Sequence, residues 1–159
     1  SSDWGGPGAM LNIGMNDNKF NALSKTLGEK SAAKLYLRFI NAYATHVARL
    51  DPDAFQDPET PNIEDVKAAL QIYADEAAEP FPQSVEKQLS NVLRSMARAW
   101  EGTSARLLRQ AKGAPADAGL GLVVQAMAIG VGRGECGSGV IQFASSDTGL
   151  SEIHGRYLR

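Results

Sequence analysis

Glycines gather near the end of the chain, where a stretch rich in them separates two apolar stretches. Residues 119–130 read GLGLVVQAMAIG, residues 131–139 read VGRGECGSG, and residues 140–149 read VIQFASSDTG. This order predicts a strand, a tight turn and a second strand, and so a β-hairpin with a glycine-rich tip. Glycine lets the backbone approach a ligand closely, and successive amides in such a turn bind anions. The tip therefore indicates a phosphate site, and with it a nucleotide.

Two other interpretations of the glycine stretch compete with a phosphate site. Residues 132–137 match the G-x-G-x-x-G pattern of dinucleotide-binding folds, but that pattern requires a helix to follow. A β-branched, alternating segment follows here instead, which favours a hairpin that covers phosphates. Glycine-rich tips also occur in turns that bind nothing. The motif alone leaves the phosphate site and the plain turn both open.

A few other residues could take part in chemistry. Gln125 interrupts an apolar strand, so its amide needs either a ligand or a buried hydrogen-bond network. Cys136 has no histidine near it in sequence to act as a base, and we interpret it as a small loop residue. His46 has no partner at metal-ligand spacing, and His154 is expected at an exposed strand end. None of these residues is predicted to be catalytic.

The composition is that of an ordinary globular protein, with 43% hydrophobic and 21% charged residues in a chain of 159. A net charge of −2 without a basic stripe argues against nucleic-acid and membrane partners. A single cysteine excludes an internal disulfide and favours a reducing, cytoplasmic setting. The chain starts at Ser1 without a methionine or a signal peptide, which suggests a fragment.

Apolar residues at helical spacing dominate the chain as far as residue 113. They predict helices over about 17–27, 30–50, 62–77, 84–100 and 104–111, with Asn62 and Ser84 as N-caps and Gly28 ending the first helix. Arg106, Arg109 and Lys112 are expected on a solvated face of the last helix.

The period changes from 3.6 to 2 residues near Gly113–Pro115. The predicted fold class is therefore α+β, a helical bundle followed by a small piece that contains a β-hairpin. Residues 1–14 are predicted to be a loop entering the domain, residues 15–113 a helical subdomain, and residues 114–159 a β-rich segment with the glycine-rich hairpin.

Several runs of residues carry a family resemblance across nearly the whole chain. They are PGAM with LNIGMND near the start, YLRFINAYATHV, FPQSVEKQL, VLRSMARAWEGTSARLLRQ, VQAMAIGVGRGECGSGV, and DTG with HGRYL near the end. Together they resemble the N-terminal, ATP-grasp-type nucleotide-binding domain of the pyruvate phosphate dikinase family.

The resemblance implies a domain that binds Mg-ATP and passes a phosphoryl group to a histidine on a separate domain, in the conversion of ATP, phosphate and pyruvate to AMP, pyrophosphate and phosphoenolpyruvate. It also implies ATP-binding roles for a strand glutamine, for the hairpin tip over the phosphates, and for a second phosphate-side loop. The matching residues are Gln125; Gly137, Ser138 and Gly139; and Pro7 and Gly8.

The chain also departs from the family pattern. Three residues are absent after Met10, an arginine is lost after Phe143, and Arg156 replaces a glutamate. The family's phosphate-binding lysine and arginine and its acidic magnesium ligands match nothing in the chain. We therefore expect ATP and Mg as cofactors, with the metal ligands outside this chain, and no catalysis by the chain alone. The other domains of a dikinase-like protein are the expected partners, and a homodimer stays open. The alternative is a non-catalytic interaction or regulatory module that has lost ATP.

Overall fold

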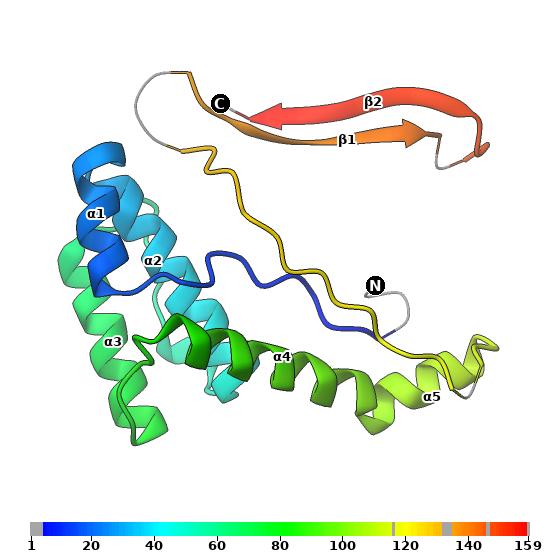
Figure 1. Ribbon diagram of the computed structural model, residues 1–159, viewed down its shortest axis with the longest axis horizontal. Helices are drawn as coiled ribbons and strands as arrows, with labels where there is room; N and C mark the ends of the chain where they lie inside the picture. Colours follow the sequence, from blue (N-terminus) through cyan, green and yellow to red (C-terminus); the bar gives the residue numbers. More distant parts are fainter. Residues whose placement is uncertain (1–4, 116, 132–134, 146, 159) are drawn as a thin grey trace.

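The computed structural model describes residues 5–115, 117–131, 135–145 and 147–158. Within them, five α-helices are followed by a two-stranded antiparallel sheet (Figure 1). The predicted α+β class, a helical bundle followed by a β-hairpin, is thus confirmed. None of the described helices is both long enough and apolar enough to cross a membrane.

The predicted helices form, and their caps follow the sequence signals. Asn16 accepts a hydrogen bond from the Lys19 amide at the start of α1. Asn62 and Asp65 form a reciprocal capping box on α3, and Ser84 caps α4. The helices are α1 (Asp17–Leu27), α2 (Glu29–Tyr43), α3 (Ile63–Ala77), α4 (Val85–Glu101) and α5 (Thr103–Ala111).

The long helix predicted over 30–50 is α2 continued by a π-helical turn, Ala44–Ala48. Arg49 ends this turn in the left-handed conformation, with φ 61°. A short 3-10 turn, Pro52–Ala54, then leads toward α3. The change of helical type explains why the apolar spacing alone gave one continuous helix.

Aromatic rings fill the core between α2, α3 and the loop before α4. Phe81, from that loop, makes edge-to-face contacts with Phe39, Tyr43 and Tyr73, with ring centroids 5.2 to 5.7 Å apart. Tyr36, on α2, is 1% exposed, and its hydroxyl donates to Asp17 Oδ1 over 2.9 Å. The core therefore joins α1, α2 and α3 into one bundle.

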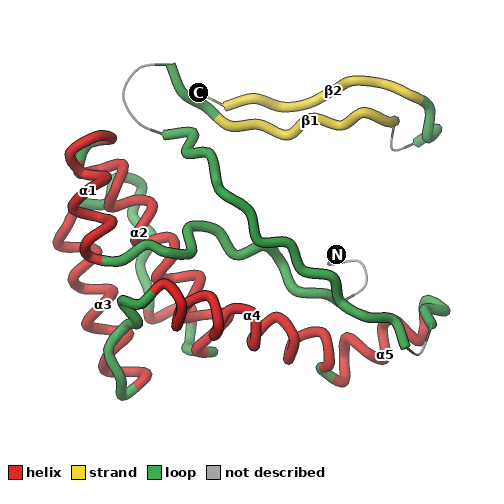
Figure 2. The backbone as a smooth tube through the Cα atoms, in the orientation of Figure 1, coloured by secondary structure: helices red, strands yellow, loops and turns green. Residues whose placement is uncertain are grey.

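The chain leaves α5 as an extended segment, residues 117–131, that returns past α4 toward the bundle (Figure 2). Trp100 Nε1 donates to the carbonyl of Ala118 over 3.2 Å. At the other end of the segment, Val131 packs against the core. Residues 119–130, predicted to be a strand, belong to no strand in the structure.

The hairpin of the structure lies one segment later than predicted. It pairs β1 (Ser138–Ala144) with β2 (Ser151–Leu158), and residue 145 and residues 147–150 are the described part of the connection between them. Local turn chemistry accounts for the difference: Ser145 Oγ accepts hydrogen bonds from the amides of Asp147 and Thr148, and Gly149 takes a positive φ of 70°. The prediction that the glycine stretch is the turn between strands over residues 119–130 and 140–149 was wrong, because no strand forms over 119–130 and β1 pairs with β2 instead.

Candidate functional site

The glycines predicted to cover phosphates lie at the start of β1. Ser138 pairs with Leu158 and Gly139 with Tyr157 in the antiparallel register. A Cβ added to Gly137 would collide with the Leu158 carbonyl and the Tyr157 ring, and one added to Gly139 would collide with the Arg156 carbonyl. These glycines are therefore required by the close approach of β2, whatever else they bind.

The backbones of Gly130 and Gly137 lie in close contact, and we call this contact the neck. A Cβ on Gly130 would collide with the carbonyl oxygen of Gly137. Residues 132–134, on which part of the predicted tip falls, lie outside the described residues. Cys136, next to the neck, is half-buried.

Gln125 lies in the extended segment with its side chain exposed. Its neighbours Val123 and Val124 are exposed as well, at 84% and 64%. A buried hydrogen-bond network, one of the two explanations of this glutamine, is therefore excluded in this structure. A ligand contact stays a prediction.

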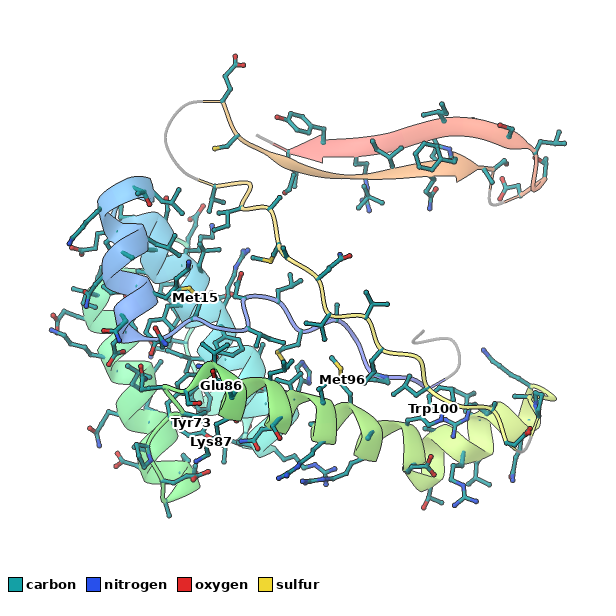
Figure 3. All side chains as sticks on the ribbon, viewed as in Figure 1. Met15, Tyr73, Glu86, Lys87, Met96 and Trp100 are labelled. Carbon is teal, nitrogen blue, oxygen red and sulfur yellow. The ribbon has the colours of Figure 1, made fainter. Side chains whose placement is uncertain are left out.

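Gly8 lines a small hollow of about 170 Å³ between the N-terminal segment and α4. Met96, labelled in Figure 3, lines the hollow from α4, and His46 lines it from the π-helical turn. A Cβ at Gly8 would touch nothing within 4 Å, so space does not require glycine there. The hollow is smaller than the roughly 300 Å³ at which ligand pockets begin.

The predicted site residues are therefore not brought together. Gly8 lies beside α4, Gln125 lies on the extended segment, and Gly137, Ser138 and Gly139 lie at the neck and in a hairpin that stands clear of the helices in Figure 1. Among the described residues, no three His, Cys, Asp or Glu side chains gather as metal ligands would.

Arg156 adds a positive charge close to Ser138. It is opposite Val140, so in the pleated sheet it lies on the same face as Ser138 and diagonal to it. Both side chains are exposed. A hydroxyl and a guanidinium on one face can bind an anion together.

A larger hollow, of about 390 Å³, lies between α3, α4 and the π-helical turn, and the sequence did not predict it. Its lining includes Tyr43, Tyr73, Glu79, Asn91 and Arg98. Asn91 Nδ2 donates to the Tyr43 hydroxyl over 2.8 Å. Burial raises the pKa of Tyr43, and it raises that of Tyr73 to about 12. At neutral pH both phenols are therefore hydrogen-bond donors and not nucleophiles.

The comparisons with known proteins confirm the family resemblance, although no protein-family model matches the chain. The chain is 26% identical over 176 residues to pyruvate, phosphate dikinase 2 of Oryza sativa subsp. japonica, a match that covers 96% of this chain and 19% of that protein. It is 25% identical over 172 residues to the chloroplastic pyruvate, phosphate dikinase 1 of Zea mays, covering 96% of this chain and 18% of that protein. Over nearly its whole length the chain is thus similar to a part of the pyruvate, phosphate dikinases, and it spans about a fifth of the length of these relatives.

Proposed function

We propose that this chain forms one wall of an ATP site in a dikinase-like phosphotransferase that makes phosphoenolpyruvate from ATP, phosphate and pyruvate. The observation that carries the proposal is the likeness to pyruvate, phosphate dikinases along 96% of the chain. In this proposal residues 15–113 are a helical support, and residues 114–159 are the β-rich part of an ATP-grasp-type domain. A cytoplasmic setting is part of the proposal.

The phosphate-binding surface would be the face of the hairpin that carries Ser138 and Arg156. On this face Ser138 offers a hydroxyl and Arg156 a guanidinium, while Gly137 and Gly139 accommodate the close approach of β2. Arg156 stands where the family has a glutamate, and it supplies positive charge to a chain that lacks the arginine expected after Phe143. This exchange favours an anionic ligand at the hairpin.

The described residues offer groups suited to the phosphates of ATP but not to a magnesium ion. The hairpin offers groups that bind phosphate, whereas the described residues contain no cluster of carboxylates for Mg²⁺. Phosphoryl transfer depends on such charge neutralisation. The metal ligands and the phosphohistidine would therefore come from other parts of a longer dikinase-like protein, and the chain alone would not be catalytic.

A titration of the isotope-labelled chain with Mg-ATP, followed by amide chemical shifts, tests the proposal. We expect weak binding, with a dissociation constant of about 1 mM or above, which corresponds to about −4 kcal/mol. The shifts should concentrate at Gly137, Ser138, Gly139 and Arg156. A constant in the micromolar range would show that the chain holds a complete site, and the absence of shifts at the hairpin would count against the phosphate surface.

The alternative, a non-catalytic interaction or regulatory module, is favoured by one observation. The hairpin exposes large apolar side chains, with Phe143 at 69% and Ile153 at 76% exposure, as interaction surfaces do. If the amide chemical shifts of the hairpin did not change with ATP but changed when other domains of a dikinase-like protein were added, the interaction module would be the better description.

A further inference from the structure

The larger hollow, between α3, α4 and the π-helical turn, takes no part in the proposed ATP site. Its volume of about 390 Å³ lies within the range of pockets that hold small ligands. Its floor carries Tyr43 and Tyr73, which are 1% and 2% exposed. Its rim carries the exposed side chains of Glu76, Glu79 and Arg98. The hollow therefore combines a buried floor with charged groups of both signs.

The hydroxyl of Tyr73 has no hydrogen-bond partner within the described part of the chain. The other two buried phenols of this core do have partners: Tyr43 accepts from Asn91 Nδ2 over 2.8 Å, and Tyr36 donates to Asp17 Oδ1. A buried hydroxyl that pairs with nothing is unfavourable and rare. Because Tyr73 lines the hollow, a ligand there would supply the partner that the protein does not.

One end of the hollow is electronegative. Glu76 lies in the last turn of α3, and Glu79 lies two residues after the helix ends at Ala77. The last turn of α3 contains no basic residue, so no side chain of that turn offsets the negative end of the helix dipole. Glu79 forms an exposed ion pair with Lys87, labelled in Figure 3, over 3.4 Å, whereas Glu76 forms none with the described residues. This end favours a cation.

The other end of the hollow is positively charged. On α4 the hollow is lined by Asn91, Ser95 and Arg98, which share one helix face because they are four and three positions apart. Arg98 lies about 16 Å further along the helix axis than Lys87, and so lies away from the end where Lys87 meets Glu79. Arg98 also forms no ion pair with the described residues. Its guanidinium is therefore free to bind a carboxylate.

Apolar side chains complete the lining of the hollow. Val47, Ala48 and Leu50 contribute from the π-helical turn and the residues just after it, and Ala77 contributes from α3. Side chains of this kind pack against the methylene groups of long polar molecules. The lining as a whole matches an aliphatic chain with a cation at one end and a carboxylate at the other.

We propose that this hollow binds a free basic amino acid, and that arginine is the best match. The guanidinium lies between Glu76 and Glu79, the Tyr73 hydroxyl accepts one of its N–H groups, and the carboxylate pairs with Arg98. Asn91 Oδ1 accepts from the α-ammonium group, since the amide nitrogen already donates to a tyrosine. Arginine matches better than lysine because its planar guanidinium presents five donors and can bind two carboxylates and a hydroxyl at once. None of these residues belongs to the hairpin, so the site goes beyond the proposed function.

A titration of the isotope-labelled chain with three matched ligands, in the absence of ATP, tests the proposal. L-Citrulline replaces the guanidinium of L-arginine by a neutral urea, and agmatine is arginine without its carboxylate. We expect L-arginine to bind at least about tenfold more tightly than either, because each of the others loses one charge-assisted pairing. The amide shifts should concentrate at residues 73–79 and 91–98.

Each of the other outcomes overturns a stated part of the proposal. A dissociation constant for L-arginine above about 10 mM would overturn the site. Equal affinity for L-citrulline would overturn the pairing with Glu76 and Glu79. Equal affinity for agmatine would show that the hollow holds a guanidinium alone, as on the side chain of a partner protein, and would overturn the free amino acid.

Variants at the two ends of the hollow locate the ligand. Arg98→Gln should weaken L-arginine about tenfold and leave agmatine unchanged, whereas Glu76→Gln should weaken both. Arg94→Gln is the matched control, since Arg94 is exposed on α4 but does not line the hollow. All three positions are exposed, so the helical bundle should fold, and circular dichroism verifies this. Equal losses in Arg94→Gln and Arg98→Gln would mean that only the overall charge attracts the ligand, and would overturn the site. Because no nucleotide is present, these outcomes are independent of whether ATP binds.

Discussion

The guanidinium of Arg109 lies over the indole ring of Trp100, with Cζ 3.7 Å from the ring centroid. Its Nη2 also donates to the Trp100 carbonyl over 2.9 Å, and Arg109 as a whole is only 8% exposed. The prediction of a solvated Arg109 was therefore wrong. This pair holds α5 against the end of α4 across Gly102, and Trp100 in turn holds the extended segment through Ala118.

Arg109→Met should lower the free energy of unfolding by about 1–3 kcal/mol, because it removes the cation–π contact and the hydrogen bond and keeps the length of the side chain. Urea denaturation followed by tryptophan fluorescence measures the change. Arg106→Met is the matched control, since Arg106 is exposed on the same helix. Equal losses in the two variants would contradict a structural role for the Arg109–Trp100 pair.

Gln88→Leu should destabilise the chain by about 2–4 kcal/mol, because several buried backbone groups lose their partners. Gln88 is 0% exposed. Its Oε1 accepts from the Gly14 amide, and its Nε2 donates to the carbonyls of Met15 and Pro82. The free energy of unfolding again provides the measurement, with the exposed Gln71→Ala as control. A loss below about 1 kcal/mol would mean that water replaces the amide.

The stability of the chain should fall as the pH rises from about 10 to about 12. Desolvation raises the pKa of Tyr73 from 10.0 to about 12, and it also raises the pKa values of Tyr36 and Tyr43. In this window the unfolded chain releases phenolic protons that the folded chain keeps, so the unfolded state is favoured. Urea midpoints across the window measure the slope, and Tyr73→Phe should make it shallower. An unchanged slope in that variant would place Tyr73 in a wetter environment than the structure shows.

Gly139→Ile should disrupt the hairpin, because a side chain at this position collides with the Arg156 carbonyl. Cross-strand nuclear Overhauser effects between β1 and β2 report the pairing directly. Gly119→Ile is the control, since a Cβ there meets nothing within 4 Å. Should Gly139→Ile keep the pairing and lose only the response to ATP, the glycine would serve the ligand more than the sheet.

Ser138→Ala should leave the hairpin intact and weaken ATP binding by about 1 kcal/mol at most, the contribution of one neutral hydrogen bond. The Mg-ATP titration described above measures this change, with Ser151→Ala as the control at the far end of the hairpin. A loss of all ATP-induced shifts would mean that the hydroxyl, and not the backbone of the flanking glycines, holds the phosphate.

The sequence predicted the helices well because their signals are local. Asn62, Asp65 and Ser84 cap their own helices, and Gly28 ends α1, so a window of a few residues contains the necessary information. The burial of Gln88 and Arg109 was not predicted, because it does not depend on local signals. Their partners lie outside that window, and each is a polar side chain on a helix face that the apolar pattern could not identify as buried.

The strands were harder to predict because strand pairing depends on which distant segments of the chain come to lie side by side. Residues 119–130, 138–144 and 151–158 all have the composition of strands, and the sequence does not state which two pair. The candidate site depends on that choice, because the pairing decides which side chains share a face of the sheet with Ser138. Fold class therefore followed from the pattern, whereas the geometry of the site did not.

The buried amide of Gln88 also sets an order of events during synthesis. Residues 14 and 15 are fixed by a side chain 73 or more positions later in the chain, whereas α1 and α2 contact each other across a single glycine. A ribosome that delivers the chain from its N-terminus exposes the first segment well before Gln88 emerges. We expect the α1–α2 pair to form early and the N-terminal segment to stay undocked until α4 has been made, so that a nascent chain stalled before residue 88 remains open to proteolysis near Gly14.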